Sequence, residues 1–247
     1  MAPAVYYIDP SDAPDGDGMI ALTGDEARHA AQVARVRVGE TVDLVDGQGR
    51  RLAGEVTAVA RDRVDVRIDH VTTEVAPSPR VVVVQALAKG DRGEQAVAAM
   101  TEVGVDVIVP WAAEHCVTRW VGERAERGVA KWRTTARAAA KQARRSRVPD
   151  VLDLYSTGDV ESLVADADLA LSLDESADEP LAGVSVPHDG TIVLVVGPEG
   201  GFSEAERLRD AGARPTRLGP SVLRTSTAGP VGAAVVLSRT PRWGAPA

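Results

Sequence analysis

The sequence predicts an α/β protein, in which a β-rich N-terminal domain precedes a larger domain with a mostly parallel sheet. Residues 1–74 contain Val-rich runs of strand length that are separated by turn residues. A short Pro-rich segment, residues 74–80, is typical of a linker. After it, apolar runs alternate with helical patterns, as they do in parallel βαβ units. We therefore expect two domains, residues 1–74 and residues 75–247.

The N-terminal domain is expected to be a small antiparallel barrel. Residues 23–36 have a helical pattern with Thr23 at the capping position. Residues 41–68 follow with several Val-rich strands, and the Asp-Gly-Gln-Gly sequence at 46–49 predicts a hairpin turn between two of them.

The C-terminal domain is expected to alternate strands and helices. Continuous apolar runs predict buried strands at residues 80–88, 106–111, 167–173 and 191–196. Helical spacing predicts helices at residues 91–105, 128–146, 203–212 and 227–240. Ser203 followed by Glu206 forms a capping-box pattern, and Pro230 is expected within the first turn of the last helix.

Composition excludes several classes of protein. With 44% hydrophobic residues the 247-residue chain can bury a substantial core. The single cysteine, Cys116, excludes an internal disulfide and a cysteine-based zinc site, and the four histidines are not at metal-ligand spacing. No apolar run approaches the roughly 20 residues of a membrane span, and the first residues do not resemble a secretory signal. We expect a cytoplasmic protein without a metal.

Charge is distributed unevenly along the chain. The whole chain carries a net charge of −8, but residues 119–147 contain ten basic residues and only two acidic ones. A local cationic surface on an acidic protein is the pattern expected where one face meets a polyanion.

Two Gly-Pro loops stand out in the C-terminal domain. The first, "VLVVGPEGGFSEAE" at residues 193–206, places Gly197, Pro198 and Glu199 directly after a predicted strand. The second, "RLGPSVLRTSTAG" at residues 217–229, leads through Arg224 into a predicted helix. Ligands bind at the carboxyl edge of such sheets, and glycines let the backbone approach them closely. Each loop alone could be a plain turn or helix cap; neither matches a P-loop or a dinucleotide-binding motif.

Together, "GPEGGFSEAE" and "LGPSVLRTSTA" closely resemble the C-terminal signature of the SPOUT methyltransferases. More narrowly, the chain is similar to the ribosomal RNA small subunit methyltransferase E family. The resemblance extends to "HAAQVARVRVGETVDLVDGQG", "KGDRGEQAVAAMTEVGVDVIVP" and "AAKQARRSRVP", and so covers nearly the whole chain.

The resemblance implies a PUA- or OB-like RNA-binding barrel and a SPOUT domain with a deep trefoil knot. It also implies a homodimer that methylates N3 of one uridine in 16S rRNA of the small ribosomal subunit, with S-adenosyl-L-methionine as cofactor. Carried over, the cofactor site consists of Leu171, Ser172, Leu173, Gly197, Pro198, Glu199, Gly200, Gly201, Leu218, Gly219, Leu223, Arg224 and Thr225.

The basic segment is expected to contact RNA phosphates. Arg133, Arg137, Lys141 and Arg145 are four residues apart and would form one stripe along a helix. Such a stripe is often only a solvated face, but this one contains no acidic residues, so its charges repel one another. The expected RNA-binding residues are Arg35, Arg37, Lys89, Arg133, Arg137, Lys141, Arg144 and Arg145; Arg35 and Arg37 could also be strand-edge charges.

Three residues are candidates for catalysis. Uracil N3 must lose its proton before it can accept a methyl group, and an adjacent arginine would stabilise the resulting anion. Arg224 is the first candidate for this role and Arg92 the second. Glu199 is a candidate base, as is Glu102, although both carboxylates could be structural. Alternative functions are a non-catalytic RNA-binding or ribosome-assembly factor, and a SPOUT enzyme of different specificity.

Overall fold

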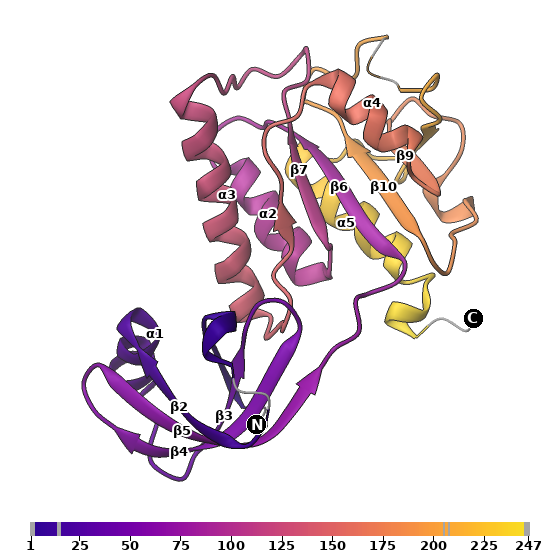
Figure 1. The fold of residues 1–247 in the computed structure, drawn as a ribbon. Helices are drawn as coiled ribbons and strands as arrows, with labels where there is room; N and C mark the ends of the chain where they lie inside the picture. Colours follow the sequence, from indigo (N-terminus) through magenta and orange to yellow (C-terminus); the bar gives the residue numbers. More distant parts are fainter. Residues whose placement is uncertain (1–2, 14–15, 205, 207, 245–247) are drawn as a thin grey trace. The chain divides into compact units, whose positions relative to one another are not determined.

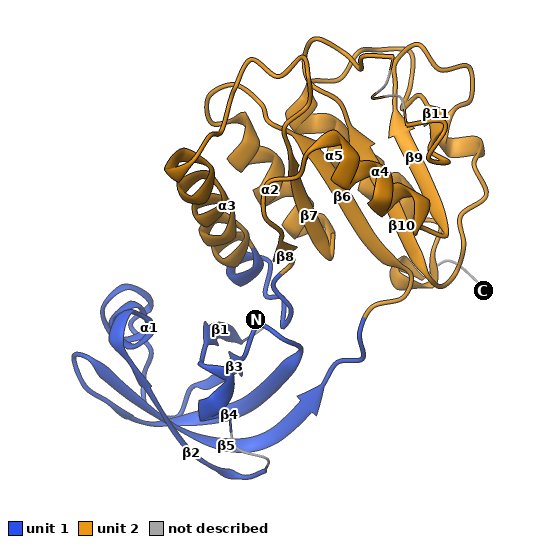
Figure 2. Cartoon of the chain, turned by 45° about the horizontal axis from the view of Figure 1, so that its top comes forward, with its two compact units in different colours: residues 1–76, 140–148 blue, residues 77–139, 149–247 orange. Residues whose placement is uncertain are grey.

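The computed structural model describes residues 3–13, 16–204, 206 and 208–244. The chain forms two compact units (Figures 1 and 2). The first comprises residues 1–76 and 140–148, and the second comprises residues 77–139 and 149–247.

The first unit is built on a five-stranded sheet with the order β1-β3-β4-β5-β2. Its strands are β1 (Ala4–Tyr7), β2 (Gly18–Thr23), β3 (Thr41–Val45), β4 (Arg50–Val59) and β5 (Arg63–Thr73). All ladders are antiparallel except the one between β1 and β3, which is parallel. The expectation of a purely antiparallel barrel is therefore corrected at this edge, where the intervening β2 and helical segment return the chain in the same direction.

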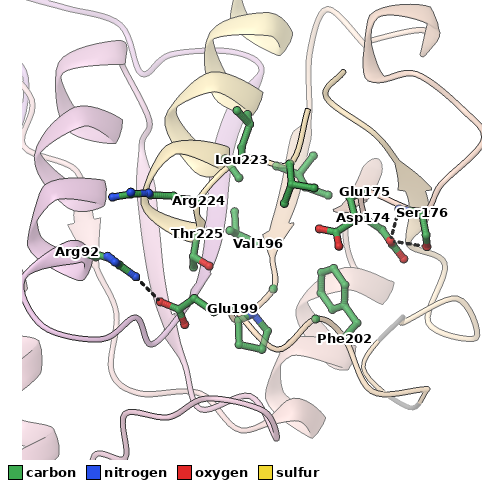
Figure 3. Close-up of a pocket in the computed structure, with 16 residues that line it drawn as sticks. Arg92, Asp174, Glu175, Ser176, Val196, Glu199, Phe202, Leu223, Arg224 and Thr225 are labelled. Carbon is green, nitrogen blue, oxygen red and sulfur yellow. Dashed lines mark hydrogen bonds and ion pairs between the residues drawn. The ribbon is translucent and has the colours of Figure 1, made fainter. Parts of the chain in front are cut away.

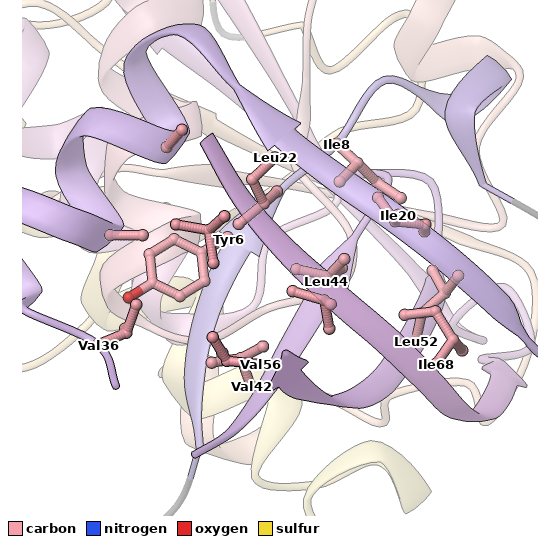
Figure 4. Packing of buried hydrophobic residues seen from close by; sticks show 14 residues of the cluster. Tyr6, Ile8, Ile20, Leu22, Val36, Val42, Leu44, Leu52, Val56 and Ile68 are labelled. Atoms are coloured by element: carbon pink, nitrogen blue, oxygen red, sulfur yellow. The ribbon is translucent and has the colours of Figure 1, made fainter. Parts of the chain in front are cut away.

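Alternating residues of these strands form the core of the first unit (Figure 4). Leu52 and Val56 of β4 are fully buried, and Val66 and Ile68 of β5 pack in the same cluster with Leu44 of β3. A period of two follows from the pleat of a strand, which points successive side chains to opposite faces. The Val-rich alternation in the sequence is thus the direct cause of a one-sided core.

The predicted hairpin turn at residues 46–49 is confirmed. The Asp46 carboxylate accepts hydrogen bonds from the backbone N–H groups of Gln48 (2.7 Å) and Arg50 (3.0 Å). Gly47 and Gly49 adopt φ values of +79° and +112°, which residues with a Cβ rarely adopt.

The helix after β2 is only partly as expected. α1 (Gly24–Arg28) begins after Thr23, but the Thr23 side chain makes no capping hydrogen bond. The chain continues as a π-helical segment, His29–Ala34, which ends where Arg35 adopts a left-handed conformation.

The second unit contains a six-stranded sheet with the order β11-β9-β10-β6-β7-β8, in which every ladder is parallel. Its strands are β6 (Arg80–Ala86), β7 (Val107–Trp111), β8 (Asp150–Val151), β9 (Leu169–Leu173), β10 (Thr191–Val196) and β11 (Arg214–Thr216). The central strands are buried along almost their whole length, as their uninterrupted apolar sequences predict.

Helices cover both faces of this sheet (Figure 1). They are α2 (Arg92–Val103), α3 (Glu123–Gln142), α4 (Thr157–Ala165) and α5 (Thr225–Leu237). α4 lies on one face, and α2 and α5 pack together on the other. Because α5 begins at Thr225, Pro230 lies in its second turn rather than its first.

The helix predicted at residues 203–212 is wrong for the residues that the structure describes there. None of them is α-helical: Glu206 has a 3-10 conformation and its backbone N–H donates to the Ser203 carbonyl (3.1 Å), residues 209–212 form a turn, and Leu208 adopts a left-handed conformation with φ of 55°. Glu206 is buried, and its carboxylate accepts hydrogen bonds from the backbone N–H groups of Ser203 (3.3 Å) and Glu114 (2.5 Å). Half of the expected capping box is thus present at a short 3-10 turn, and the Glu206 side chain also joins two loops.

Candidate functional site

The site lies at the carboxyl edge of the parallel sheet, where β9 and β10 end beside each other. Leu173 pairs with Val196 in the last register position, so the residues that follow both strands meet at this edge. The start of α5 is brought to the same edge by Gln85 of β6, whose side-chain amide donates to the Thr225 carbonyl (3.3 Å).

These segments surround a cavity of about 450 Å³, which we call the loop cavity (Figure 3). It brings together three stretches that are far apart in the sequence, namely the end of β9, the Gly-Pro loop after β10 and the entrance to α5. The lining residues are Arg92, Leu173, Asp174, Glu175, Ser176, Val196, Gly197, Pro198, Glu199, Gly201, Phe202, Val222, Leu223, Arg224, Thr225 and Ala228.

Most of the predicted cofactor residues line the loop cavity or the space beside it. Leu218 and Gly219 line a smaller cavity of about 50 Å³, which shares Leu173, Asp174, Glu175, Leu223 and Ala228 with the loop cavity. Leu171 and Ser172 are buried within β9 and line neither cavity. Gly200 also lines neither, because it faces His115, whose Cβ would lie 2.9 Å from a Cβ at position 200.

The residues that directly follow β9 were not among the predicted site residues. Asp174 and Glu175 place two carboxylates in the lining of the loop cavity, and Asp174 accepts hydrogen bonds from the backbone N–H and the hydroxyl of Ser176. The same rule that selected the first Gly-Pro loop could have found them, because they also follow the end of a parallel strand.

Backbone conformation and packing shape the first Gly-Pro loop. A Cβ on Gly197 would lie 3.0 Å from the Phe202 ring, and Gly201 has a φ of +76°. Nδ1 of His115 lies 3.0 Å from the Gly201 carbonyl oxygen and anchors the loop from outside. Burial raises the pKa of the neighbouring Cys116 thiol, which favours the neutral, unreactive form.

The charged side chains are divided between two sides of the loop cavity. Figure 3 shows Arg92 and Arg224 on one side and Asp174 and Glu175 on the other. Arg92 lies 3.6 Å from the Glu199 carboxylate, which also accepts a hydrogen bond from the Lys89 backbone N–H at 3.5 Å.

Arg224 differs from Arg92 in having no charged partner. It caps α5 through its backbone, and its side chain is exposed. Within the described part of the chain, its guanidinium makes no ion pair. Arg224 is thus the cation of the loop cavity that is available to a ligand.

The basic stripe is only partly as predicted. α3 ends at Gln142, so Arg133, Arg137 and Lys141 lie on the helix and Arg145 lies beyond it. Arg133 pairs with Asp153 (3.0 Å) and Lys141 with Glu26 (2.7 Å). The stripe itself contains no acidic residues, but carboxylates elsewhere in the chain compensate the charges of Arg133 and Lys141.

The remaining predicted RNA-binding residues do not line the loop cavity. Arg35 and Arg37 are exposed in the first unit, and Lys89 is exposed in the loop after β6. The first unit also contains Lys141, Arg144 and Arg145, whereas Lys89, Arg133 and Arg137 belong to the second.

The described residues were also considered as a metal site and as a membrane span, and they form neither. No group of three or more His, Cys, Asp or Glu side chains there is arranged to hold a metal ion. No helix among the described residues has the length and apolarity that crossing a membrane requires.

Comparison with known proteins identifies the family. Residues 76–237 match the RNA methyltransferase domain family, and residues 22–69 match the RNA methyltransferase PUA domain family. The ribosomal RNA small subunit methyltransferase E of Mycobacterium bovis is 40% identical, over all of this chain and 96% of the relative.

Two solved structures resemble the whole chain. One is the ribosomal RNA small subunit methyltransferase E of Neisseria gonorrhoeae bound to S-adenosyl methionine, with a TM-score of 0.81, 28% identity and coverage of 96% of this chain and 97% of that one. The other is a methyltransferase described as putative from Legionella pneumophila in complex with the same cofactor, with a TM-score of 0.83, 26% identity and coverage of 97% and 99%. The chain therefore belongs to the ribosomal RNA small subunit methyltransferase E family of RNA methyltransferases.

Proposed function

We propose that this enzyme transfers a methyl group from S-adenosylmethionine to N3 of one uridine in 16S rRNA of the small ribosomal subunit. The observation that carries the proposal is the loop cavity, which joins the two Gly-Pro loops beside the exposed guanidinium of Arg224. The names of the relatives support ribosomal RNA of the small subunit as the substrate.

The residues of the loop cavity fit the cofactor. Its volume of about 450 Å³ lies in the range that small-molecule sites occupy, roughly 300–1,000 Å³. Leu173, Val196 and Leu223 offer apolar surface to an adenine ring, and the backbone around Gly197 and Gly201 offers hydrogen-bonding groups close to the ligand. Asp174 and Glu175 can accept hydrogen bonds from hydroxyl or ammonium groups.

When bound, S-adenosylmethionine supplies a methyl group on a positively charged sulfur. The chain must then align uracil N3 with that methyl group and stabilise the negative charge that loss of the N3 proton places on O2 and O4. Arg224 is suited to the second task, because its guanidinium lines the loop cavity and has no charged partner among the residues that the structure describes.

Arg92 and Glu199 are better suited to positioning than to proton transfer. The Glu199 carboxylate is engaged by Arg92 at 3.6 Å and by the Lys89 backbone N–H at 3.5 Å, and both contacts hold it at the edge of the loop cavity. We assign Glu199 to holding Arg92 and the first Gly-Pro loop in place, and Arg92 to supporting the charge stabilisation by Arg224.

Four further features are proposed on the strength of the family resemblance. Residues 1–74 form an RNA-binding domain and residues 75–247 form the catalytic domain. The C-terminal segments form a trefoil knot, the protein is a homodimer, and it is located in the cytoplasm. Light scattering after size-exclusion chromatography tests the homodimer directly, because a single monomeric mass would contradict it.

The test of the proposed reaction uses small ribosomal subunits from cells that lack this gene. The purified enzyme and isotopically labelled cofactor are added, and the digested 16S rRNA is analysed by nucleoside mass spectrometry. We expect one 3-methyluridine per subunit. A 2′-O-methyl nucleoside would replace the proposed specificity with ribose methylation, and failure to bind the cofactor in calorimetry, with or without RNA, would reject a methyltransferase.

A further inference from the structure

A second hollow of the second unit shares a wall segment with the loop cavity. It has a volume of about 310 Å³ and is called the Trp120 pocket here. Arg92 lines the loop cavity, whereas the adjacent Gly93 and Glu94 line the Trp120 pocket, so the start of α2 borders both. The lining residues are Ala88, Gly90, Gly93, Glu94, Thr118, Trp120, Arg124, Arg127, Gly128, Lys131 and Trp132.

The indole of Trp120 is held rigidly in this pocket. A Cβ on Gly128 would lie 2.6 Å from the ring, so the ring packs directly against the α3 backbone. It also forms a T-shaped pair with the buried Trp132, at a centroid distance of 5.3 Å and an angle of 73°. Trp132 in turn sits over Gly93, where a Cβ would lie 2.9 Å away. The partly exposed Trp120 thus offers a fixed aromatic surface, on which a nucleobase can stack.

Three cations of α3 line the Trp120 pocket together with the indole. Arg124, Arg127 and Lys131 are three and four residues apart and therefore share one side of the helix. Lys131 pairs with Glu94 of the pocket at 2.6 Å, so the carboxylate that would repel an anion is neutralised. Arg127 lies 3.5 Å from Glu123, and both side chains are largely exposed.

Arg124 is the cation available to a ligand. Among the described residues it has no acidic partner. It also lies in the first turn of α3, where the helix macrodipole is already positive and a cation is unfavourable. An anionic ligand would remove this repulsion.

We propose that the Trp120 pocket binds a nucleotide of the substrate RNA that flanks the methylated one, with its base on Trp120 and its phosphate on Arg124 and Arg127. The proposal rests on RNA being the substrate of the loop cavity. It explains why an aromatic face and unpaired positive charge occur together beside the segment that carries Arg92.

The first test measures RNA affinity by filter binding over a range of salt concentrations, with a 16S rRNA transcript as the probe. Arg124→Ala should raise the Kd for RNA roughly fivefold and reduce the slope of log K against log salt by about one. The matched control is Arg209→Ala, an exposed arginine of the same unit that lines neither cavity. An Arg124→Ala protein that binds RNA as the control does would overturn the proposal.

The second test follows Trp120 itself. Trp120→Leu should raise the Kd for RNA about tenfold, because the stacking surface is lost, whereas Trp120→Phe should restore most of the affinity. RNA should quench the tryptophan emission of the parent, and Trp120→Phe should lose this quenching while it still binds RNA. Unchanged quenching in Trp120→Phe would overturn the stacking role, even if Trp120→Leu does not fold.

A third measurement separates this proposal from the proposed function. Binding of a single-stranded uridine oligomer does not depend on catalysis. If the parent does not methylate 16S rRNA but Arg124→Ala still weakens oligomer binding, RNA binding in the Trp120 pocket is supported and the proposed reaction is rejected. If the parent methylates normally and neither Arg124→Ala nor Trp120→Leu affects RNA binding, the proposed reaction is supported and RNA binding in the Trp120 pocket is rejected. A polyglutamate peptide that competes as well as the oligomer would reject RNA as the occupant.

Discussion

The loop cavity and the basic stripe of α3 were both predicted from the sequence, the first from two Gly-Pro loops and the family resemblance and the second from the spacing of cations, but they differ in the structure. Most residues predicted for the cofactor site line the loop cavity or the smaller cavity beside it, although they come from the ends of β9 and β10 and from the segment that leads into α5. The stripe consists of cations at regular spacing, but Arg133 and Lys141 are paired with carboxylates and Arg145 lies outside the helix.

The difference arises from what determines each feature. Strand register places Leu173 beside Val196, so the following loops must meet whatever their side chains are. Availability of a charge depends instead on partners that can be distant in the chain, such as Glu26, which lies 115 residues before Lys141. The position of a site that the backbone determines can therefore be predicted from sequence more readily than whether the charges on a helix face are unpaired.

The largest expected effect concerns the chemistry in the loop cavity. Arg224→Ala should lower kcat by about 100-fold, because it removes the charge that stabilises the uracil anion. The Kd for RNA should change much less, and Arg224→Lys should recover part of the rate. Steady-state methylation assays at saturating RNA check this, and an unchanged kcat would remove Arg224 from the reaction.

The next effect tests whether backbone shape determines cofactor binding. Gly197→Ala should raise the Kd for S-adenosylmethionine about tenfold, because the added Cβ would crowd the Phe202 ring at 3.0 Å. Gly158→Ala in α4 is the matched control, since a Cβ at that position would meet only the Ser156 hydroxyl at 3.9 Å and Gly158 lines neither the loop cavity nor the smaller cavity beside it. Calorimetric titration of both proteins gives the comparison, and equal affinities would show that this loop tolerates a side chain.

A smaller effect tests the pairing of Lys141. A double-mutant cycle with Lys141→Met and Glu26→Gln should give a coupling of about 1 kcal/mol in the free energy of unfolding, measured in urea. The ion pair is partly buried and lies in the first unit, beneath the ring of Tyr6 in the cation–π arrangement. Lys141→Met should also change the Kd for RNA less than twofold; a large change would return Lys141 to the RNA-binding residues.

The smallest effect concerns the exposed pair of Arg133 and Asp153. Asp153→Asn should change the free energy of unfolding by less than about 0.5 kcal/mol, because exposed ion pairs contribute little. Releasing Arg133 should strengthen RNA binding slightly, up to about twofold, if the stripe contacts phosphates. Filter binding with Arg133→Gln as the control measures this, and weaker binding by Asp153→Asn would contradict it.

Local sequence patterns correctly predicted the strands and the turn, whose conformation depends on neighbouring residues. They failed at residues 203–212, where a residue contacts a segment far away in the chain. The apolar runs of β6 and β10 and the Asp46 turn formed as predicted. α4 was not predicted, although Ser156 and Asp159 form a complete capping box at its start. The predicted helix at 203–212 failed because the buried Glu206 carboxylate bonds to the Glu114 backbone, which lies 92 residues earlier.

The α/β class, the parallel sheet and the two Gly-Pro loops follow from the order of the amino acids, because hydrophobic period and glycine position are local properties of the chain. Folding was needed to show that Asp174 and Glu175 join the loop cavity and that Arg92 holds Glu199. It was also needed to show that Arg224 lacks a charged partner among the described residues while Lys141 has one. Electrostatic pairing depends on distances in space, and packing sets these distances between residues that are far apart along the chain.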